Sequence, residues 1–329
     1  MTGIAIVGQG YMGRTHAEAW SRLGHGDDIR YITAPGDREW SDVAAAAAFT
    51  THLDEVLFDP AVDRLSVCTP TPSHASIAIR ALRAGKHVLL EKPIALTLDD
   101  ARQIESAAAH GDRVLMIAQV VRFFAGYEAL AAVRDSGRIG DVRAVRASRV
   151  LATPTWAPWW PDETQSGGVP VDFSIHDFDQ ANFFLGTPVA VRAARTAHEA
   201  PLETTIEYES GGIAQVHSFP YLPQGSPFSC SLELIGSRGQ AAYRMISGAP
   251  TDGAEAGISE LTISTVEGVE RFTIADNDPY AREIEYFSAC IASGTPPVRS
   301  TTASAIAALE VSLATRASLA RGGERVELA

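Results

Sequence analysis

Two places in this chain carry side chains that could act on an alcohol or a carbonyl group. The first is Glu91-Lys92-Pro93, which follows the apolar run Val88–Leu90. That run predicts a buried parallel strand, so the ammonium group of Lys92 would stand at a strand's carboxyl end. Such a group can polarise a carbonyl or share an alcohol proton. Taken alone, the same three residues are more typical of a solvated turn.

The second place is the pair Asp172 and His176. Apolar residues recur through 169–184 in a pattern that predicts a helix with one buried face. Residues four apart on a helix project from the same side, so the two side chains would be neighbours. A histidine can take an alcohol proton near neutral pH, and a nearby carboxylate can orient it. The alternative is a pair that only stabilises the helix. Asp177 and Asp179 face elsewhere and are expected to be structural.

A glycine-rich segment near the N-terminus predicts a dinucleotide site. The spacing Gly-x-Gly-x-x-Gly is met by Gly8, Gly10 and Gly13, with Tyr11 and Met12 between the last two. An apolar strand, Ile4–Val7, precedes this segment, and a helix follows it and ends at Gly24. The glycines permit a tight turn, approach of a pyrophosphate and close helix packing, while the helix N-terminus binds the anion.

The sequence leaves the choice between NAD and NADP open. The second strand, 29–33, usually ends in an acidic residue in an NAD-binding chain, whereas Ala34 stands near that position here. Asp37 could reach a ribose from the loop, or Arg38 could accommodate a 2′-phosphate. Both could equally be ordinary loop charges.

The elements that must position these residues alternate as strand and helix over the first 120 residues. This alternation predicts an α/β fold with a doubly wound parallel sheet. Polar residues follow three more of its strands: Thr69, Pro70 and His74 after one, Glu91 and Lys92 after the next, and Gln119 after the last. Ligands bind at the carboxyl ends of such strands, so we expect the three groups to meet at one crevice.

The second half of the chain has a different pattern. Period-two alternation between glycine turns, around 204–208, 216 and 230–234, predicts a largely antiparallel sheet with one face covered. Helices are predicted at about 279–293 and 302–321. We therefore expect two domains, 1–120 and 121–329.

Composition narrows the class of protein. The chain has 329 residues, 46% of them hydrophobic and 20% charged, which is typical of a globular protein. A net charge of −13 argues against nucleic-acid binding. We expect no membrane span, since no apolar run approaches the roughly 18–20 residues required. The absence of a secretory pattern favours a cytoplasmic location. Three scattered cysteines and nine histidines form no metal-ligand spacing, so we expect no metal.

A loop rich in tryptophan, 153–161, lies between the two halves and holds Trp156, Trp159 and Trp160. Aromatic faces can pack against the C–H faces of a sugar ring, fill a subunit contact or simply pack the loop. Trp159 and Arg122 join Lys92 among the candidate substrate-binding residues.

Taken in order, these motifs resemble the Gfo/Idh/MocA family of sugar and polyol oxidoreductases over essentially the whole chain. The resemblance rests on Gly8-x-Gly10-x-x-Gly13, Thr69-Pro70 through His74, Glu91-Lys92-Pro93, Arg122-Phe123, Ser136-Gly137-Arg138-Ile139-Gly140, Gly167-Gly168 through Asp172, and His176-Asp177-x-Asp179. The segment 168–186 looks most like inositol dehydrogenases and their relatives.

The resemblance implies a Rossmann domain joined to an α/β domain with an open-faced sheet that often makes an oligomer contact. It implies reversible hydride transfer between nicotinamide C4 and a secondary alcohol carbon. By position, Lys92 would bond the reacting oxygen, His176 would be the general acid/base, and Asp172 would orient the substrate and support that proton transfer. Pro70, His74 and Glu91 would line the cofactor site.

Three readings compete. The first is an NAD(P)-dependent dehydrogenase acting on a sugar, a cyclitol or a derivative, as a homo-oligomer. The second is cofactor-retaining glycoside cleavage or epimerisation, in which transient oxidation at one carbon acidifies its neighbour. The third is a non-catalytic nucleotide-binding protein, against which Lys92, Asp172 and His176 speak.

Overall fold

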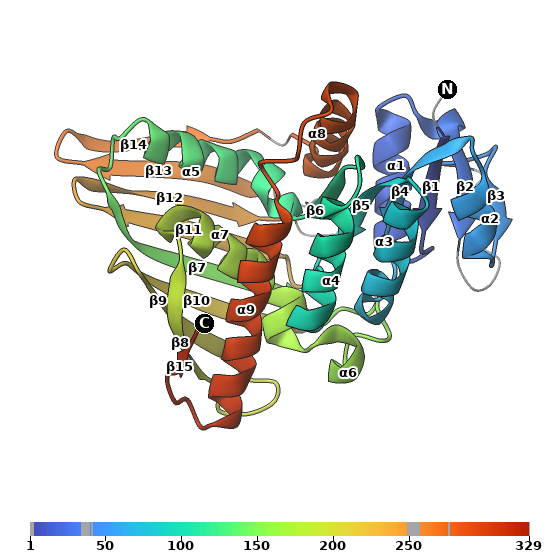
Figure 1. The fold of residues 1–329 in the computed structure, drawn as a ribbon. Coiled ribbons are helices and arrows are strands. Elements are labelled where there is room, and N and C mark those ends of the chain that lie inside the picture. Colours follow the sequence, from blue (N-terminus) through green and yellow to red (C-terminus); the bar gives the residue numbers. More distant parts are fainter. Residues whose placement is uncertain (1–2, 34–39, 41, 249–256, 276, 329) are drawn as a thin grey trace. The chain divides into compact units, whose positions relative to one another are not determined.

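A computed structural model describes residues 3–33, 40, 42–248, 257–275 and 277–328 (Figure 1). The chain divides into two units. Unit 1 comprises Met1–Phe123, Trp156–Ser166 and Asp278–Ile306, and unit 2 comprises Phe124–Thr155, Gly167–Asn277 and Ala307–Ala329. The predicted division at residue 120 lies close to the first break. The predicted division assigned Trp156–Ser166 and Asp278–Ile306 to the second domain, whereas in the structure they belong to unit 1. Their contacts with unit 1 are distant in sequence and leave no local pattern.

Unit 1 is built on a six-stranded sheet with the order β3-β2-β1-β4-β5-β6. Its strands are β1 (Gly3–Val7), β2 (Ile29–Thr33), β3 (Ala48–Thr50), β4 (Val62–Val67), β5 (His87–Glu91) and β6 (Leu115–Ala118). All neighbouring strands are parallel, which confirms the predicted doubly wound sheet. The chain changes direction across the sheet between β1 and β4, and ligands bind at such switch points.

Unit 1 also contains helices. They are α1 (Tyr11–Arg22), α2 (Leu53–Phe58), α3 (His74–Arg83), α4 (Leu98–Ala109), α6 (Glu163–Ser166) and α8 (Pro279–Ser293), with the 3₁₀ turns η1 (Gly26–Asp28), η2 (Thr71–Ser73) and η3 (Val120–Phe123). Helices α1 and α8 pack together, and Trp20, Ile284 and Phe287 belong to one buried cluster with β1 and β5 residues. Burial of these large apolar side chains is the main stabilising term for the unit.

Unit 2 is built on a nine-stranded sheet with the order β14-β13-β12-β11-β7-β10-β9-β8-β15. Its strands are β7 (Val142–Ala152), β8 (Pro188–Ala194), β9 (Leu202–Tyr208), β10 (Ile213–Leu222), β11 (Ser229–Gly236), β12 (Gly239–Ile246), β13 (Ile258–Thr265), β14 (Gly268–Thr273) and β15 (Val326–Glu327). Among the strands of the described residues, only β7 and β10 of this sheet pair in parallel, so the mostly antiparallel sheet is confirmed. Helices α5 (Ala125–Asp135) and α7 (Ile175–Leu185) pack on it. Buried and exposed residues alternate along β9, because successive side chains point to opposite faces.

Helix α9 (Thr302–Ala320) meets the length and composition of a membrane span, with a mean hydropathy of 1.2 over its most apolar window. No such segment was expected from the apolar runs of the sequence. Much of this apolar character is alanine, and 44% of that window is buried within the protein. Ser318 Oγ, near the helix end, accepts a hydrogen bond from Ala193 N of β8. A helix in the core of a protein can have the same length and apolar composition as a membrane span, and the contacts of α9 are of that kind.

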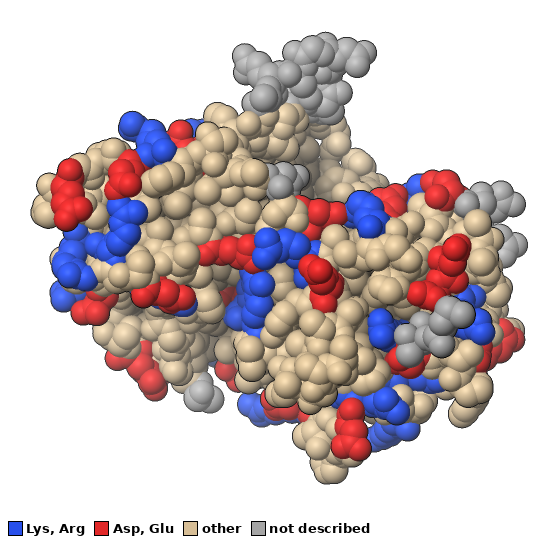
Figure 2. Space-filling view, turned by 90° about the horizontal axis from the view of Figure 1, so that it is seen from above, with Lys and Arg blue, Asp and Glu red and all other residues tan. Residues whose placement is uncertain are grey.

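Acidic and basic side chains are interspersed over the face of the protein shown in Figure 2. The net charge of −13 is therefore not gathered into one acidic patch on this face.

Candidate active site

The glycine-rich turn after β1 has the geometry of a dinucleotide-binding loop. Gly8 has φ +110°, and its amide donates to the carbonyl of Thr33 at 2.7 Å. A Cβ on Gly13 would lie 1.9 Å from the carbonyl oxygen of Gly8, so only glycine lets α1 pack this closely on the turn. The predicted strand–turn–helix context is therefore present in the structure.

The N-terminus of α1 can accept an anion. Gly10 is its N-cap, no side chain makes the capping hydrogen bond, and a Cβ on Gly10 would meet nothing within 4 Å. The first backbone N–H groups of a helix need partners from outside the helix. Open space in front of them is what a pyrophosphate requires.

Strand β2 ends at Thr33, as the sequence predicts for 29–33. Asp37 and Arg38, the residues predicted to distinguish NAD from NADP, lie outside the described residues.

Glu91, at the end of β5, joins the lysine turn to α1. Its Oε1 lies 3.0 Å from Nε2 of His16, and its Oε2 accepts a hydrogen bond of 3.0 Å from the amide of Lys92. Both Glu91 and His16 are buried, and Lys92 is half-buried and precedes a cis peptide bond to Pro93. The carboxylate of Glu91 therefore holds the backbone from which the Lys92 side chain projects.

His74 joins the loops that follow β4 and β5. Its Nδ1 lies 2.8 Å from the carbonyl oxygen of Pro93, and its Nε2 lies 2.9 Å from that of Thr69. Burial lowers the pKa of His74, against the two carbonyls, which favour the charged form. In the structure this imidazole fixes the positions of two strand-end loops relative to each other.

Two further predicted residues are held by the segment Asp278–Ile306, whose participation sequence reasoning missed. The side-chain oxygen of Gln119 accepts hydrogen bonds from the hydroxyls of Ser300 (2.9 Å) and Ser304 (3.0 Å). Arg122 Nη1 donates to the carbonyl of Arg299 at 2.7 Å, and Arg299 Nη2 donates back to that of Arg122. No local pattern reports these contacts, because the partners are more than 170 residues apart.

The tryptophan segment Trp156–Ser166 is part of unit 1. The ring of Trp156 packs on that of Tyr11, with centroids 5.6 Å apart, and α6 packs against η2. Trp159 is half-buried and Trp160 is buried. The segment therefore contacts the glycine-rich loop and the loop after β4.

Asp172 and His176 lie in unit 2, but not on one regular α-helix as predicted. Asp172 is in a π-helical turn, Val169–Phe173, and His176 is in the first turn of α7. The amide of Ser174 donates to the carbonyl of Val169 five residues earlier, which widens the turn. Both side chains are half-buried. Single-turn π-helices occur often at functional sites.

Asp177 is structural, as expected. It is fully buried and accepts two hydrogen bonds from Arg149, at 2.8 and 2.9 Å. Burial opposes the charge of Arg149, and the carboxylate of Asp177 outweighs this and raises the pKa of Arg149. The hydroxyl of Ser174 donates to that of Ser218 on β10 at 2.8 Å. These contacts fix the start of α7 on the sheet and thereby position the backbone of His176.

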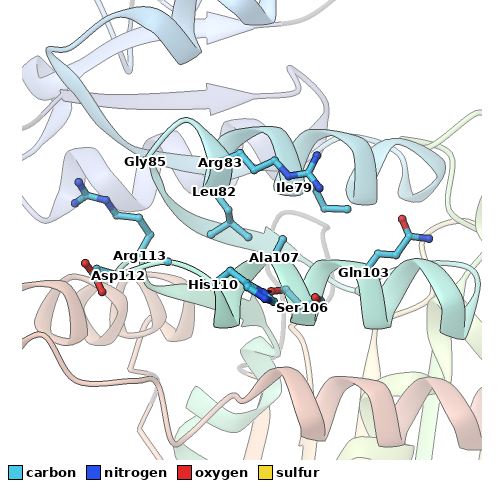
Figure 3. A pocket seen from close by; sticks show the side chains of 11 residues that line it. Ile79, Leu82, Arg83, Gly85, Gln103, Ser106, Ala107, His110, Asp112 and Arg113 are labelled. Atoms are coloured by element: carbon cyan, nitrogen blue, oxygen red, sulfur yellow. Dashed lines mark hydrogen bonds between the residues drawn. The ribbon is translucent and has the colours of Figure 1, made fainter.

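A pocket of about 690 Å³ lies between α3 and α4 (Figure 3). Arg83, His110 and Arg113 line it, next to Gly85 and ahead of the amino ends of β5 and β6. Glu91 and Lys92 stand at the carboxyl end of β5 and Gln119 follows that of β6, so this pocket is at the other edge of the sheet. None of the described candidate site residues lines it. Among the described residues, no group of three or more His, Cys, Asp or Glu could hold a metal ion.

Comparison with known proteins adds independent findings. Residues 2–119 match a family model described as an oxidoreductase family with an NAD-binding Rossmann fold, and residues 127–242 match the GFO/IDH/MocA C-terminal domain. The inositol 2-dehydrogenase of Rhizobium meliloti (strain 1021) is 29% identical over 308 residues, covering 88% of this chain and 89% of the relative. The scyllo-inositol 2-dehydrogenase (NAD(+)) of Bacillus subtilis (strain 168) is 25% identical over 343 residues, covering 98% and 95%.

A solved structure has the same fold over the full length. The crystal structure of GenD2 from gentamicin A biosynthesis, in complex with NAD, superposes with a TM-score of 0.83 at 26% identity. It covers 100% of this chain and 96% of GenD2.

Proposed function

Because this chain belongs to the Gfo/Idh/MocA oxidoreductase family, we propose that it transfers a hydride between a nicotinamide cofactor and a secondary alcohol carbon of a sugar, a cyclitol or a derivative. The observation that carries the proposal is the glycine-rich turn between β1 and α1 on a parallel sheet. The turn that carries Lys92 is linked to α1 through Glu91, which contacts both His16 and the amide of Lys92. The relatives named for inositol oxidation support a polyhydroxylated ring as the substrate class.

The residues of unit 1 fit a dinucleotide. The α1 N-terminus has no capping side chain, the space in front of Gly10 is open, and Gly8 and Gly13 allow a close approach of backbone. Loops after β1 and β4 flank the switch point at which such a ligand binds. When bound, the nicotinamide ring supplies the hydride acceptor or donor.

The proton chemistry falls to three side chains. We assign Lys92 Nζ as the donor of a hydrogen bond to the reacting oxygen, which stabilises negative charge developing there. His176 takes the hydroxyl proton during oxidation and returns it during reduction. Asp172 orients the substrate and supports that proton transfer. These roles follow from the family motif and from the chemistry of each residue type.

A panel of sugars and polyols tests the function directly. The purified protein is incubated with each compound and either NAD or NADP, and reduced nicotinamide is followed by absorbance. Oxidation of one ring polyol with one cofactor is expected. Silence across the panel, with NADH binding intact, would move the assignment to the cofactor-retaining alternative.

A cytoplasmic location and assembly of several copies through the unit 2 sheet also stay proposals. Sedimentation of the purified protein would test the assembly, and fractionation of the source cells would test the location.

A further inference from the structure

One segment of unit 1 lies in the chain between two segments of unit 2. The chain belongs to unit 2 up to Thr155 and again from Gly167, yet the contacts of Trp156–Ser166 place these residues in unit 1. We call these eleven residues the strap. A chain that enters another folding unit and returns does so at the cost of ordering its backbone, so its contacts there need an explanation.

The strap contacts two loops, one at each of its ends. At its start, the Trp156 ring packs on Tyr11, the first residue of α1, with centroids 5.6 Å apart and planes inclined by 38°. At its end, α6 packs against η2, the turn that follows β4. In Figure 1, α6 is drawn below the lower end of α3.

These two loops flank the switch point of the sheet. Tyr11 follows β1 and η2 follows β4, and β1 and β4 are the neighbouring strands at which the strand order reverses. The loops touch directly, since a Cβ on Gly8 would lie 2.5 Å from the carbonyl oxygen of Cys68. A dinucleotide binds in the crevice between such loops. The strap therefore contacts both of the loops that border this crevice.

The aromatic pair is only partly used by the protein itself. Tyr11 is 58% exposed and Trp156 is 49% exposed, although their rings pack on each other. Large exposed aromatic faces beside a ligand site are available for contact with that ligand.

The strap is also held in shape without a ligand. Asp162 accepts hydrogen bonds from both the amide (2.9 Å) and the hydroxyl (2.7 Å) of Thr164, the second residue of α6. These two hydrogen bonds lower the pKa of Asp162. Trp160 N donates to the carbonyl of Ala157 at 2.9 Å, and both residues are buried. A pre-ordered strap loses little entropy when a ligand binds against it.

We propose that the strap lines the dinucleotide site. The rings of Tyr11 and Trp156 form an aromatic clamp, which contacts the bound nicotinamide dinucleotide and slows its release. The proposal rests on the proposed function, since it takes the dinucleotide as the occupant. Its consequence is a cofactor that leaves slowly relative to substrate and product. This property suits both dehydrogenation and the cofactor-retaining reactions.

The test is the rate at which NADH leaves the protein. NADH bound to the full chain is displaced with excess NAD in a stopped-flow instrument, and the nicotinamide fluorescence is followed. Trp156→Ala and Tyr11→Ala are each expected to raise the dissociation rate at least twofold and up to about tenfold, the range expected for one aromatic contact. Because each removes the same contact, the double variant is expected to release NADH at about the rate of the faster single variant.

Two controls separate the clamp from a general loss of structure. Phe58→Ala removes another exposed aromatic side chain of unit 1, 78% exposed on α2, and is expected to leave the rate unchanged. Trp156→Phe keeps an aromatic face and is expected to retain most of the slow release. Melting temperatures of all variants are measured without cofactor.

A dissociation rate that changes less than twofold in Trp156→Ala overturns the strap proposal, and turnover of a polyol by the same protein would leave the proposed function standing. A change only in the oligomeric state of Trp156→Ala also overturns it. If the unmodified protein shows saturable binding of neither NADH nor NADPH, both the strap and the proposed function fail.

Discussion

Nε2 of His16 and Oε1 of Glu91 lie 3.0 Å apart with both side chains buried, and this contact joins α1 to the end of β5. The other carboxylate oxygen of Glu91 accepts a hydrogen bond from the amide of Lys92. The helix that begins the dinucleotide site and the turn that carries the candidate catalytic lysine are thus fixed to each other. One carboxylate therefore contacts both the helix of the glycine-rich turn and the backbone of Lys92.

We expect Glu91→Ala to destabilise the protein by about 1–3 kcal/mol, because it leaves buried donors without an acceptor. It is also expected to lower kcat, since the Lys92 backbone loses its anchor. Glu91→Gln keeps an acceptor oxygen and is expected to cost less. Urea unfolding and turnover are measured on both variants. Equal stability of Glu91→Ala and the unmodified protein would contradict the anchoring role.

Lys92→Ala and His176→Ala are each expected to reduce turnover on the order of 10²–10⁴-fold, the range for a positioned acid or base. Both variants should keep their melting temperature and their affinity for NADH. His217→Ala is the matched control for His176, because His217 is on strand β10 of the same unit and pairs with Glu203. Near-normal turnover in Lys92→Ala or His176→Ala would remove that residue from the mechanism.

The chain has only two lysines, Lys86 and Lys92, which makes amine labelling selective. Lys86 is buried, and its Nζ donates to the carbonyls of Asp59 (2.7 Å) and Val62 (2.6 Å), whereas Lys92 is half-buried. An amine-reactive reagent is expected to label Lys92 before Lys86, and NADH with a substrate analogue should slow labelling at Lys92. Peptide mass spectrometry reads both sites. Unchanged labelling of Lys92 in saturating ligand would place it outside the site.

The buried pair Arg149 and Asp177 predicts a large loss of stability when it is broken. Asp177→Ala is expected to cost about 3–5 kcal/mol, because it leaves a buried guanidinium group without its carboxylate. Glu207→Gln disrupts a more exposed pair with Arg325 and is expected to cost under about 1 kcal/mol. Denaturant unfolding of both variants gives the comparison. Similar values for the two would show that Arg149 finds another partner.

Glu283 predicts a loss of stability with rising pH. This α8 residue is fully buried, and neither carboxyl oxygen has a hydrogen-bond partner among the described residues. Burial, reinforced by the carboxylate of Glu91 and only partly offset by Arg299, raises the pKa of Glu283 well above that of an ordinary glutamate. Its stabilising contribution is complete below the unfolded-state pKa. It declines as pH rises toward the folded-state pKa, by up to about 1.4 kcal/mol per pH unit.

Glu283→Gln removes this ionisation while keeping the shape of the side chain. The variant is expected to match the unmodified protein near pH 4 and to melt at a higher temperature than it near pH 8. Glu285→Gln, on an exposed position of the same helix, serves as the control and should show no such divergence. Parallel pH dependence of the Glu283→Gln and unmodified melting curves would show that Glu283 is not held neutral.

Much of unit 1 was predictable from the sequence, because its signals are local. The apolar run Ile4–Val7 followed by three spaced glycines specifies strand, turn and helix within about twenty residues. Capping at the start of α4 is equally local, since the side chain of Thr97 accepts a hydrogen bond from Asp100 N three residues later. The π-helical turn at Asp172 was missed, because an apolar pattern of period 3.6 does not report a single widened turn.

The sequence by itself determined which side chains are available and at which strand ends they stand: the glycines, Lys92 after β5, and the Asp172–His176 stretch. Only the tertiary structure decided what holds them. Glu91 pairs with His16, Gln119 is held by Ser300 and Ser304, and Trp156 packs on Tyr11. The physical reason is that hydrogen bonds and ring contacts depend on distance in space. Segments more than seventy residues apart carry no pattern in sequence that records their meeting.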